Sequence, residues 1–126
     1  MLNDRRAVGN IPAADMDRAR RFYQQTLGFA ASTETPAGVY YAGGEGTGFF
    51  LYPTNGAGQA SHTLLSFNSD DLSADVRDLK AKGVAFEDYD IPGIVKTVDS
   101  VATMGGARAA WFRDSEGNII GLIEGM

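Results

Sequence analysis

The chain has 126 residues, of which 44% are hydrophobic and 21% are charged, as is ordinary for a globular protein. Its 11 basic and 16 acidic residues give a net charge of −5, which argues against a protein that binds nucleic acid through its phosphates. Cysteine is absent, which excludes disulfides, thiolate metal sites and cysteine nucleophiles.

The first apolar run is short and is broken by Gly9, Asn10 and Pro12, unlike the hydrophobic region of a secretion signal. No later stretch approaches the length needed to span a membrane. We therefore expect a cytoplasmic protein whose partners include neither nucleic acid nor membrane.

The first half of the chain predicts a strand, a helix and a hairpin. Residues 6–13 predict the strand, and Asp15 is a good N-cap for a helix that ends at Gly28. Two further strands are expected at 39–42 and 48–52, around a Gly-rich turn. Because this turn leads into a strand, whereas a phosphate-binding loop must lead into a helix, a hairpin is favoured.

The second half starts again after a polar linker at 53–58. A strand is expected at 62–67, followed by a helix that is capped by Asp71 and ends at Gly83. Strands are then predicted at 84–86, 96–103, 108–113 and 119–123. The carboxylates in the 114–118 turn are interpreted as turn formers and not as an acid–base pair.

Three segments of the chain resemble signature segments of the vicinal-oxygen-chelate superfamily: IPAADMDRARRFYQQTLGF, FNSDDLSADVRDLKAKGVAFE and AAWFRDSEGNIIGLIE. This superfamily includes glyoxalase I, extradiol dioxygenases, and fosfomycin- and bleomycin-resistance proteins. The resemblance implies an α+β fold in one domain, residues 1–126, with two tandem βαβββ modules at about 5–53 and 61–125. Their strands would form a curled mixed sheet around a cup-shaped cavity, and a homodimer is expected by analogy.

The resemblance also locates the positions where enzymes of this family hold a divalent metal. By the family's spacing from the helix-capping aspartates and the turn glycines, these positions are Val8, Phe50, Leu64 and Gly121. None has a donor atom, whereas zinc, iron or nickel needs about three imidazole, carboxylate or amide ligands. Among the neighbours only Thr63 offers a hydroxyl, and strand alternation predicts that it points to the opposite face. We therefore expect no metal, no cofactor and no catalytic residue of the family's usual kind.

Strand alternation adds other residues that would face the cavity. The predicted ligand-binding residues are Val8, Asn10, Phe50, Tyr52, His62, Leu64, Ser66 and Gly121. Arg6 and His62 occupy equivalent positions of the repeat, and two interpretations of them stay open. They form a polar pair that recognises a carboxylate or phosphate, or they lie at frayed strand ends in solvent.

The leading hypothesis is a metal-free protein that binds a small apolar or aromatic molecule for sequestration, resistance or sensing. One alternative is a lyase, isomerase or dioxygenase with a non-standard site, or a metal-independent catalyst that uses His62 and Tyr52. Another is a structural or interaction module without a ligand.

Overall fold

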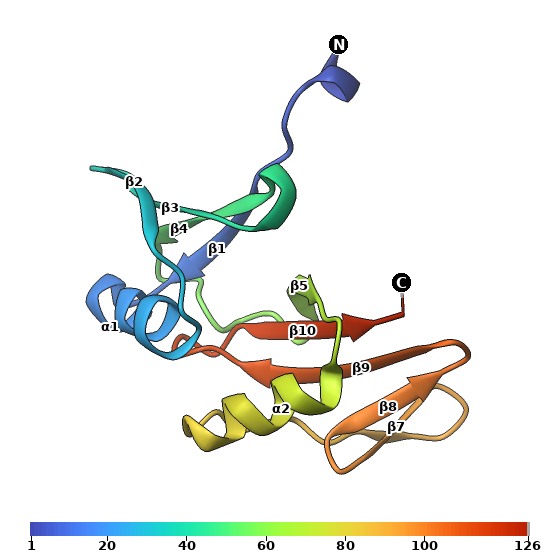
Figure 1. Ribbon diagram of the computed structural model, residues 1–126. Helices are drawn as coiled ribbons and strands as arrows, with labels where there is room; N and C mark the ends of the chain where they lie inside the picture. The colour runs from blue at the N-terminus through green and yellow to red at the C-terminus, as the bar shows by residue number, and fades with distance from the viewer. Residues whose placement is uncertain (126) are drawn as a thin grey trace. The chain divides into compact units, whose positions relative to one another are not determined.

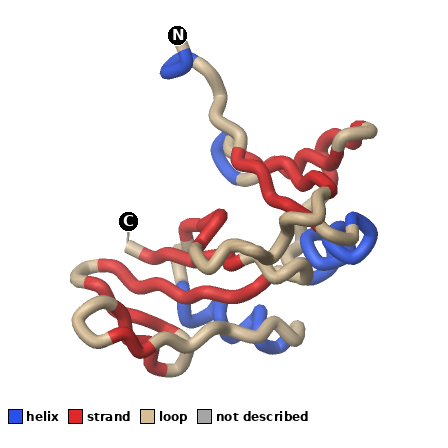
Figure 2. Tube along the Cα trace, turned by 180° about the vertical axis from the view of Figure 1, so that it is seen from behind, coloured by secondary structure: helices blue, strands red, loops and turns tan. Residues whose placement is uncertain are grey.

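The computed structural model describes residues 1–125, which divide between two compact units. The first unit is Met1–Ala57 and the second begins at Gly58. Each unit has its own mixed sheet, and in each a helix follows the first strand (Figures 1 and 2). Among the described residues, no helix is both long and apolar enough to cross a membrane.

The first unit contains one four-stranded sheet. Its elements are η1 (Leu2–Asp4), β1 (Gly9–Ala13), α1 (Met16–Arg21), the π-helix η2 (Phe22–Thr26), β2 (Ala31–Thr35), β3 (Gly38–Ala42), η3 (Gly44–Gly46) and β4 (Gly48–Pro53). The strand order is β1-β4-β3-β2, with β1 parallel to β4 and the other pairs antiparallel. The unit is therefore a βαβββ module.

The structure confirms both predicted ends of the helix in the first unit. The carboxylate of Asp15 accepts the N–H of Arg18 at 3.1 Å, as an N-cap does. Gly28 has a φ of +84°, the left-handed conformation that ends a helix. The sequence pattern did not predict that the helix would widen into a π-helix over its last part, Phe22–Thr26.

An aromatic cluster on the helix side of the sheet forms the core of this unit. The rings of Tyr23 and Tyr41 stack with centroids 6.1 Å apart, and the Phe49 ring lies 5.3 Å from that of Tyr23. Ile11 and Leu51, which are paired between β1 and β4, are also buried. Because side chains alternate along a strand, the residues between these point to the other face.

The second unit contains one six-stranded sheet. Its elements are β5 (Thr63–Asn68), α2 (Leu72–Ala81), β6 (Asp90–Ile91), β7 (Val95–Val98), β8 (Val101–Met104), β9 (Ala107–Arg113) and β10 (Ile119–Glu124). The order is β5-β10-β9-β8-β7-β6, and β5 is parallel to its neighbour β10 (Figure 1). The first four strands of this order repeat the arrangement of the first unit. The predicted α+β class and the two βαβββ modules are therefore confirmed.

Several predicted strand boundaries were wrong. The strand predicted at 6–13 begins only at Gly9, and the one predicted at 96–103 is a hairpin. Its two-residue turn, Asp99 and Ser100, has φ values of 52° and 72°, which an uninterrupted strand does not allow. The strand predicted at 84–86 is reduced to a bridge between Phe86 and Phe112. Strand β2 was not predicted because all five of its residues are exposed and carry no apolar alternation.

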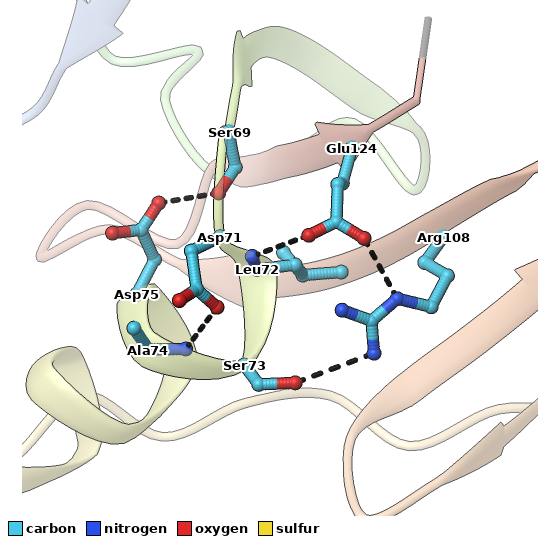
Figure 3. Close-up of polar contacts among 8 residues, drawn as sticks. All are labelled: Ser69, Asp71, Leu72, Ser73, Ala74, Asp75, Arg108 and Glu124. Carbon is cyan, nitrogen blue, oxygen red and sulfur yellow. Dashed lines mark hydrogen bonds and ion pairs between the residues drawn. The ribbon is translucent and has the colours of Figure 1, made fainter.

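The N-terminus of α2 is anchored to the end of the sheet by a polar network (Figure 3). Asp71 accepts the N–H of Ala74 at 3.1 Å, which confirms the predicted cap. Glu124 accepts the N–H of Leu72 at 2.9 Å through one oxygen and the Nε–H of Arg108 at 2.8 Å through the other. The network thus ties α2 to the last two strands of the unit.

The turn after β9 confirms the interpretation of its carboxylates. Asp114 accepts the backbone N–H groups of Glu116 and Asn118, both at 2.9 Å, and the side-chain amide of Asn118 also at 2.9 Å. The sequence did not predict that this turn would be buried, with Asn118 0% exposed to solvent. Its amide oxygen in turn accepts the N–H of Gly58 at 3.2 Å, so the turn also fixes the start of the unit.

Candidate ligand-binding pocket

The second unit contains a pocket of about 400 Å³, within the range of roughly 300–1,000 Å³ of small-molecule sites. Trp111 in β9 and Ile119 in β10 contribute to it from the sheet. Their neighbours Phe112 and Ile120 are buried on the α2 side, where Glu124 meets the helix. By strand alternation, the pocket therefore lies on the sheet face opposite α2.

Two aromatic side chains form one wall of the pocket. The rings of Tyr89 and Trp111 meet edge to face, with centroids 5.4 Å apart and planes at 74°. Tyr89 is fixed through its backbone, since its N–H donates to Thr97 Oγ1 at 2.9 Å and its carbonyl accepts the Thr97 N–H at 2.8 Å. Burial raises the pKa of the Tyr89 phenol, and the negative charge of Glu87 raises it further. The phenol therefore stays neutral at physiological pH and remains a hydrogen-bond donor.

Aliphatic side chains of the β6–β7 hairpin and of β8 make up the rest of the apolar lining. They are Ile91, Ile94, Val95 and Met104. Ile94 is 75% exposed, and Ile91 and Met104 are also largely exposed for apolar residues. Large apolar side chains gathered at the mouth of a pocket provide a surface that a ligand would remove from water.

The polar part of the lining comes from the start of β5. Ser61, His62 and Thr63 line the pocket there, and all three are exposed. No Asp or Glu is among the lining residues, although the chain carries a net charge of −5. Such a lining suits a neutral or anionic molecule better than a cation, because no carboxylate faces the ligand.

The structure brings only one of the predicted second-module residues, His62, into this pocket. Gly121 pairs with Ser66 on one side and with Trp111 on the other, so it lies on the pocket face behind the lining. A Cβ added to Gly121 would approach Ser66 Oγ to 2.8 Å. Leu64 lies at a register shift between β5 and β10. Ile119 pairs with Thr63 and Ile120 with Leu65, so Leu64 is the extra residue between them.

This register shift corrects the expectation for Thr63. Strict alternation predicts that Thr63 points away from the face of Gly121. Its Cγ2 instead lies 3.4 Å from the position of a Cβ on Gly121, and Thr63 lines the pocket. The extra residue in β5 resets the alternation, as a β-bulge does.

In the first unit, strand register places the other predicted residues on the sheet face opposite the aromatic core. Asn10 is paired with Phe50, and Pro12 with Tyr52, between the parallel strands β1 and β4. Phe50 and Tyr52 are half-buried, and Asn10 is exposed. Val8 precedes β1, and its carbonyl accepts the side-chain amide of Asn10 at 3.3 Å.

Arg6 lies near this face but is already engaged within its own unit. Its guanidinium donates to the hydroxyl of Tyr40, and its Cζ lies 5.5 Å from the centre of the Tyr40 ring. Arg6 and Tyr40 therefore form a cation–aromatic contact, which the sequence reasoning did not predict.

The residues at the family's metal positions do not fit a metal ion. Val8, Phe50 and Leu64 have hydrocarbon side chains and Gly121 has none, so no side chain at these four positions offers an electron pair to a metal. Within residues 1–125, no group of three or more His, Asp or Glu side chains is arranged to hold a metal.

Sequence reasoning missed most of the residues that form the pocket. Tyr89, Ile91, Ile94, Val95 and Met104 lie in the segment where the strands were predicted incorrectly. One signal was present, since the Pro-Gly turn at 92–93 is flanked by isoleucines that a solvent-exposed hairpin would not need.

Comparison with known proteins identifies the family. The profile of the Glyoxalase/Bleomycin resistance protein/Dioxygenase superfamily matches residues 7–122. A search of curated proteins found no match. Among solved structures, TnmS3, an antibiotic binding protein from Streptomyces sp. CB03234, has a TM-score of 0.68 and 26% identity, covering 97% of this chain and 96% of its own.

Two other solved structures have the same fold. A glyoxalase/bleomycin resistance protein from the same Streptomyces strain has a TM-score of 0.64 and 27% identity, covering 94% of this chain and 98% of its own. The glyoxalase family protein from Enterococcus faecalis has a TM-score of 0.73 and 16% identity, with coverages of 98% and 100%. This chain therefore belongs to the Glyoxalase/Bleomycin resistance protein/Dioxygenase superfamily.

Proposed function

We propose that this protein binds a small aromatic or apolar molecule in the pocket of its second unit, without a metal ion, for sequestration, resistance or sensing. The observation that carries the proposal is the lining itself. Trp111 and Tyr89 form an aromatic wall, and the hairpin around Ile94 supplies an exposed apolar surface. Such a pocket gains most of its affinity from apolar contact and stacking, with a few polar groups to orient the ligand.

Two further observations support the proposal, one on the metal positions and one on ligand binding in a relative. The four positions where the family's enzymes hold their metal have no donor atoms in this chain. A relative that is 26% identical over nearly the whole of both chains is an antibiotic binding protein. The same fold thus serves binding in a related chain, although a fold alone does not fix a function.

The polar groups of the pocket would orient the ligand. The neutral phenol of Tyr89 is a donor, and the imidazole of His62 can donate or accept. Within the first unit, Asn10, Phe50 and Tyr52 are proposed as ligand-binding residues of that unit, from their positions on the sheet face opposite the aromatic core. A homodimer is also proposed, by analogy with the family, and sedimentation equilibrium would measure it.

Nile red, a neutral aromatic dye, provides a direct test. Trp111 is the only tryptophan, so energy transfer from its indole to the dye reports binding near this residue. The substitution Ile94→Ser removes an exposed apolar side chain from the lining. We expect it to weaken dye binding about tenfold, the loss of roughly 1.4 kcal/mol of apolar contact.

The matched control is Val98→Ser. Val98 is 65% exposed on the neighbouring hairpin and does not line this pocket. Val98→Ser should leave dye binding unchanged, because the apolar side chain that it removes, one carbon smaller than that of isoleucine, lies outside the pocket. Equal weakening by both substitutions, or no dye binding by the native protein, would contradict the proposal.

A further inference from the structure

A second concave surface in the second unit shares no lining residue with the apolar pocket. It is a groove of about 470 Å³ between α2 and the β7–β8 hairpin. Ser73, Val76, Arg77 and Lys80 line it from one face of α2, since residues three and four apart lie side by side on a helix. The groove thus has a helical wall that carries two cationic side chains.

Strand β9 adds a third cation, and this one is held in place. Arg108 in β9 donates from Nε to Glu124 at 2.8 Å and from Nη1 to Ser73 Oγ at 3.3 Å (Figure 3). Because these two contacts fix the plane of the guanidinium, Arg108 loses little freedom when it receives an anion. These two hydrogen bonds use Nε and Nη1, so Nη2 would be the donor to the anion.

Carboxylates near the groove offset part of its positive charge. Asp99 in the β7–β8 turn is the only carboxylate in the lining, and Glu124 pairs with Arg108 from the sheet side. Asp78 lies 3.6 Å from Arg77, but both side chains are largely exposed, so this pair contributes little. Glu124 also accepts the N–H of Leu72, so its carboxylate interacts with the helix N-terminus as well as with Arg108.

Part of the groove lining is apolar. Val76, Val98 and Val101 line it, and Val98 remains exposed at the edge of the hairpin. Three cations and three valines in one groove suit a molecule that carries a compact negative group on an apolar body. Asp99 in the lining and Glu124 beside Arg108 offset two of these three positive charges, so the groove keeps a net excess of one positive charge for an anion.

We propose that this groove binds a small organic phosphate, with the phosphate held by Arg77, Lys80 and Arg108 and the organic part in contact with the three valines. The site goes beyond the proposed binding of an aromatic molecule in the other pocket and does not depend on it. Arg108 acts as the pre-positioned donor. Arg77 and Lys80 reach the anion from α2, and Lys80 does so by leaving the Phe86 ring, whose centre lies 5.9 Å from its Nζ.

Phenyl phosphate is a suitable probe, with binding measured by isothermal titration calorimetry. The test variant is Arg77→Gln together with Lys80→Gln, two exposed positions whose replacement keeps α2 intact. The control is Lys82→Gln together with Lys96→Gln, which removes the same charge from exposed positions of the same unit outside the groove. We expect the test variant to bind phenyl phosphate about tenfold more weakly and the control to bind it as the native protein does.

Benzyl alcohol, which has the ring but no charge, should not bind, and added salt should weaken phenyl phosphate binding. The proposal is overturned if phenyl phosphate does not bind, if both double variants weaken it equally, or if benzyl alcohol binds as well. Binding only to vesicles that contain phosphatidic acid would also overturn it, because the partner would then be a lipid surface. Ile94→Ser should leave phenyl phosphate binding unchanged, so failure of the dye experiment and failure of this one are distinguishable.

Discussion

The carboxylate of Glu124 accepts the backbone N–H of Leu72, 52 positions earlier in the chain, at a distance of 2.9 Å. The last strand of the second unit thereby supplies an acceptor to the first turn of α2, where helix N–H groups have no partner within the helix. The same carboxylate pairs with Arg108 on the adjacent strand (Figure 3). One side chain thus connects the helix to two strands.

Glu124→Gln should make the protein less stable at neutral pH and should have a smaller effect in acid. The hydrogen bond from Arg108, followed by that from Leu72, holds the pKa of Glu124 below its ordinary value of 4.5. As the pH falls, Glu124 is therefore protonated in the unfolded chain at a higher pH than in the folded protein. The stabilisation is complete above the ordinary pKa and is lost as the pH falls through the lower pKa of the folded state.

Thermal melts of the native protein and of Glu124→Gln between neutral and acid pH would measure this pH dependence. The two melting temperatures should converge as the pH falls below 4.5, the ordinary pKa of a glutamate. A constant difference across that range would show that Glu124 does not act through its charge.

Asp71→Ala should destabilise the protein by about 1 kcal/mol, as expected for loss of a helix N-cap. Asp71 accepts the N–H of Ala74, the donor that alanine would leave without a side-chain acceptor. Urea unfolding would measure the change. Asp71→Asn is the matched control, because asparagine caps helices equally well, and equal losses for the two variants would contradict the capping role.

Gly38→Ala should destabilise the first unit by about 2–3 kcal/mol, a typical cost of overpacking. A Cβ at this position would lie 2.2 Å from the backbone oxygen of Leu51, which cannot move without distorting β4. Gly44→Ala provides the control, because a Cβ there meets no atom within 4 Å. Calorimetric melts should show a large shift for the first variant and almost none for the second.

Asn118→Ala should cost about 2–3 kcal/mol, because buried groups would lose their hydrogen-bond partner. The side chain of Asn118 donates to Asp114 at 2.9 Å and accepts from Gly58 at 3.2 Å. Asn55→Ala, at an exposed position, serves as the comparison in urea unfolding. If the two variants were equally stable, the buried turn would not contribute to folding.

The sequence predicted the features of the fold that depend on local chemistry. The caps at Asp15 and Asp71 and the left-handed glycines at 28 and 83 were correct, because each reflects the backbone needs of a helix end. Because these positions recur in both halves of the chain, they also predicted the two modules.

The features that depend on long-range pairing were not predictable in the same way. The hairpin turn at Asp99 and Ser100 lacks the Asn-Gly signal of such turns, so one strand was predicted where two exist. The register shift in β5 turned Thr63 to the face of Gly121, against strict alternation. Half of the ten lining residues belong to this misassigned region, whereas His62 and Ile119, which strand alternation had indicated as lining residues, do line the pocket.

Binding without a metal can be measured through the fluorescence of Trp111. Nile red would be titrated into the protein after dialysis against EDTA, and again after addition of zinc, nickel or iron(II). We predict equal affinities under all conditions, because no donor atoms occupy the family's metal positions. Binding that disappears with EDTA and returns with one of these ions would contradict the account.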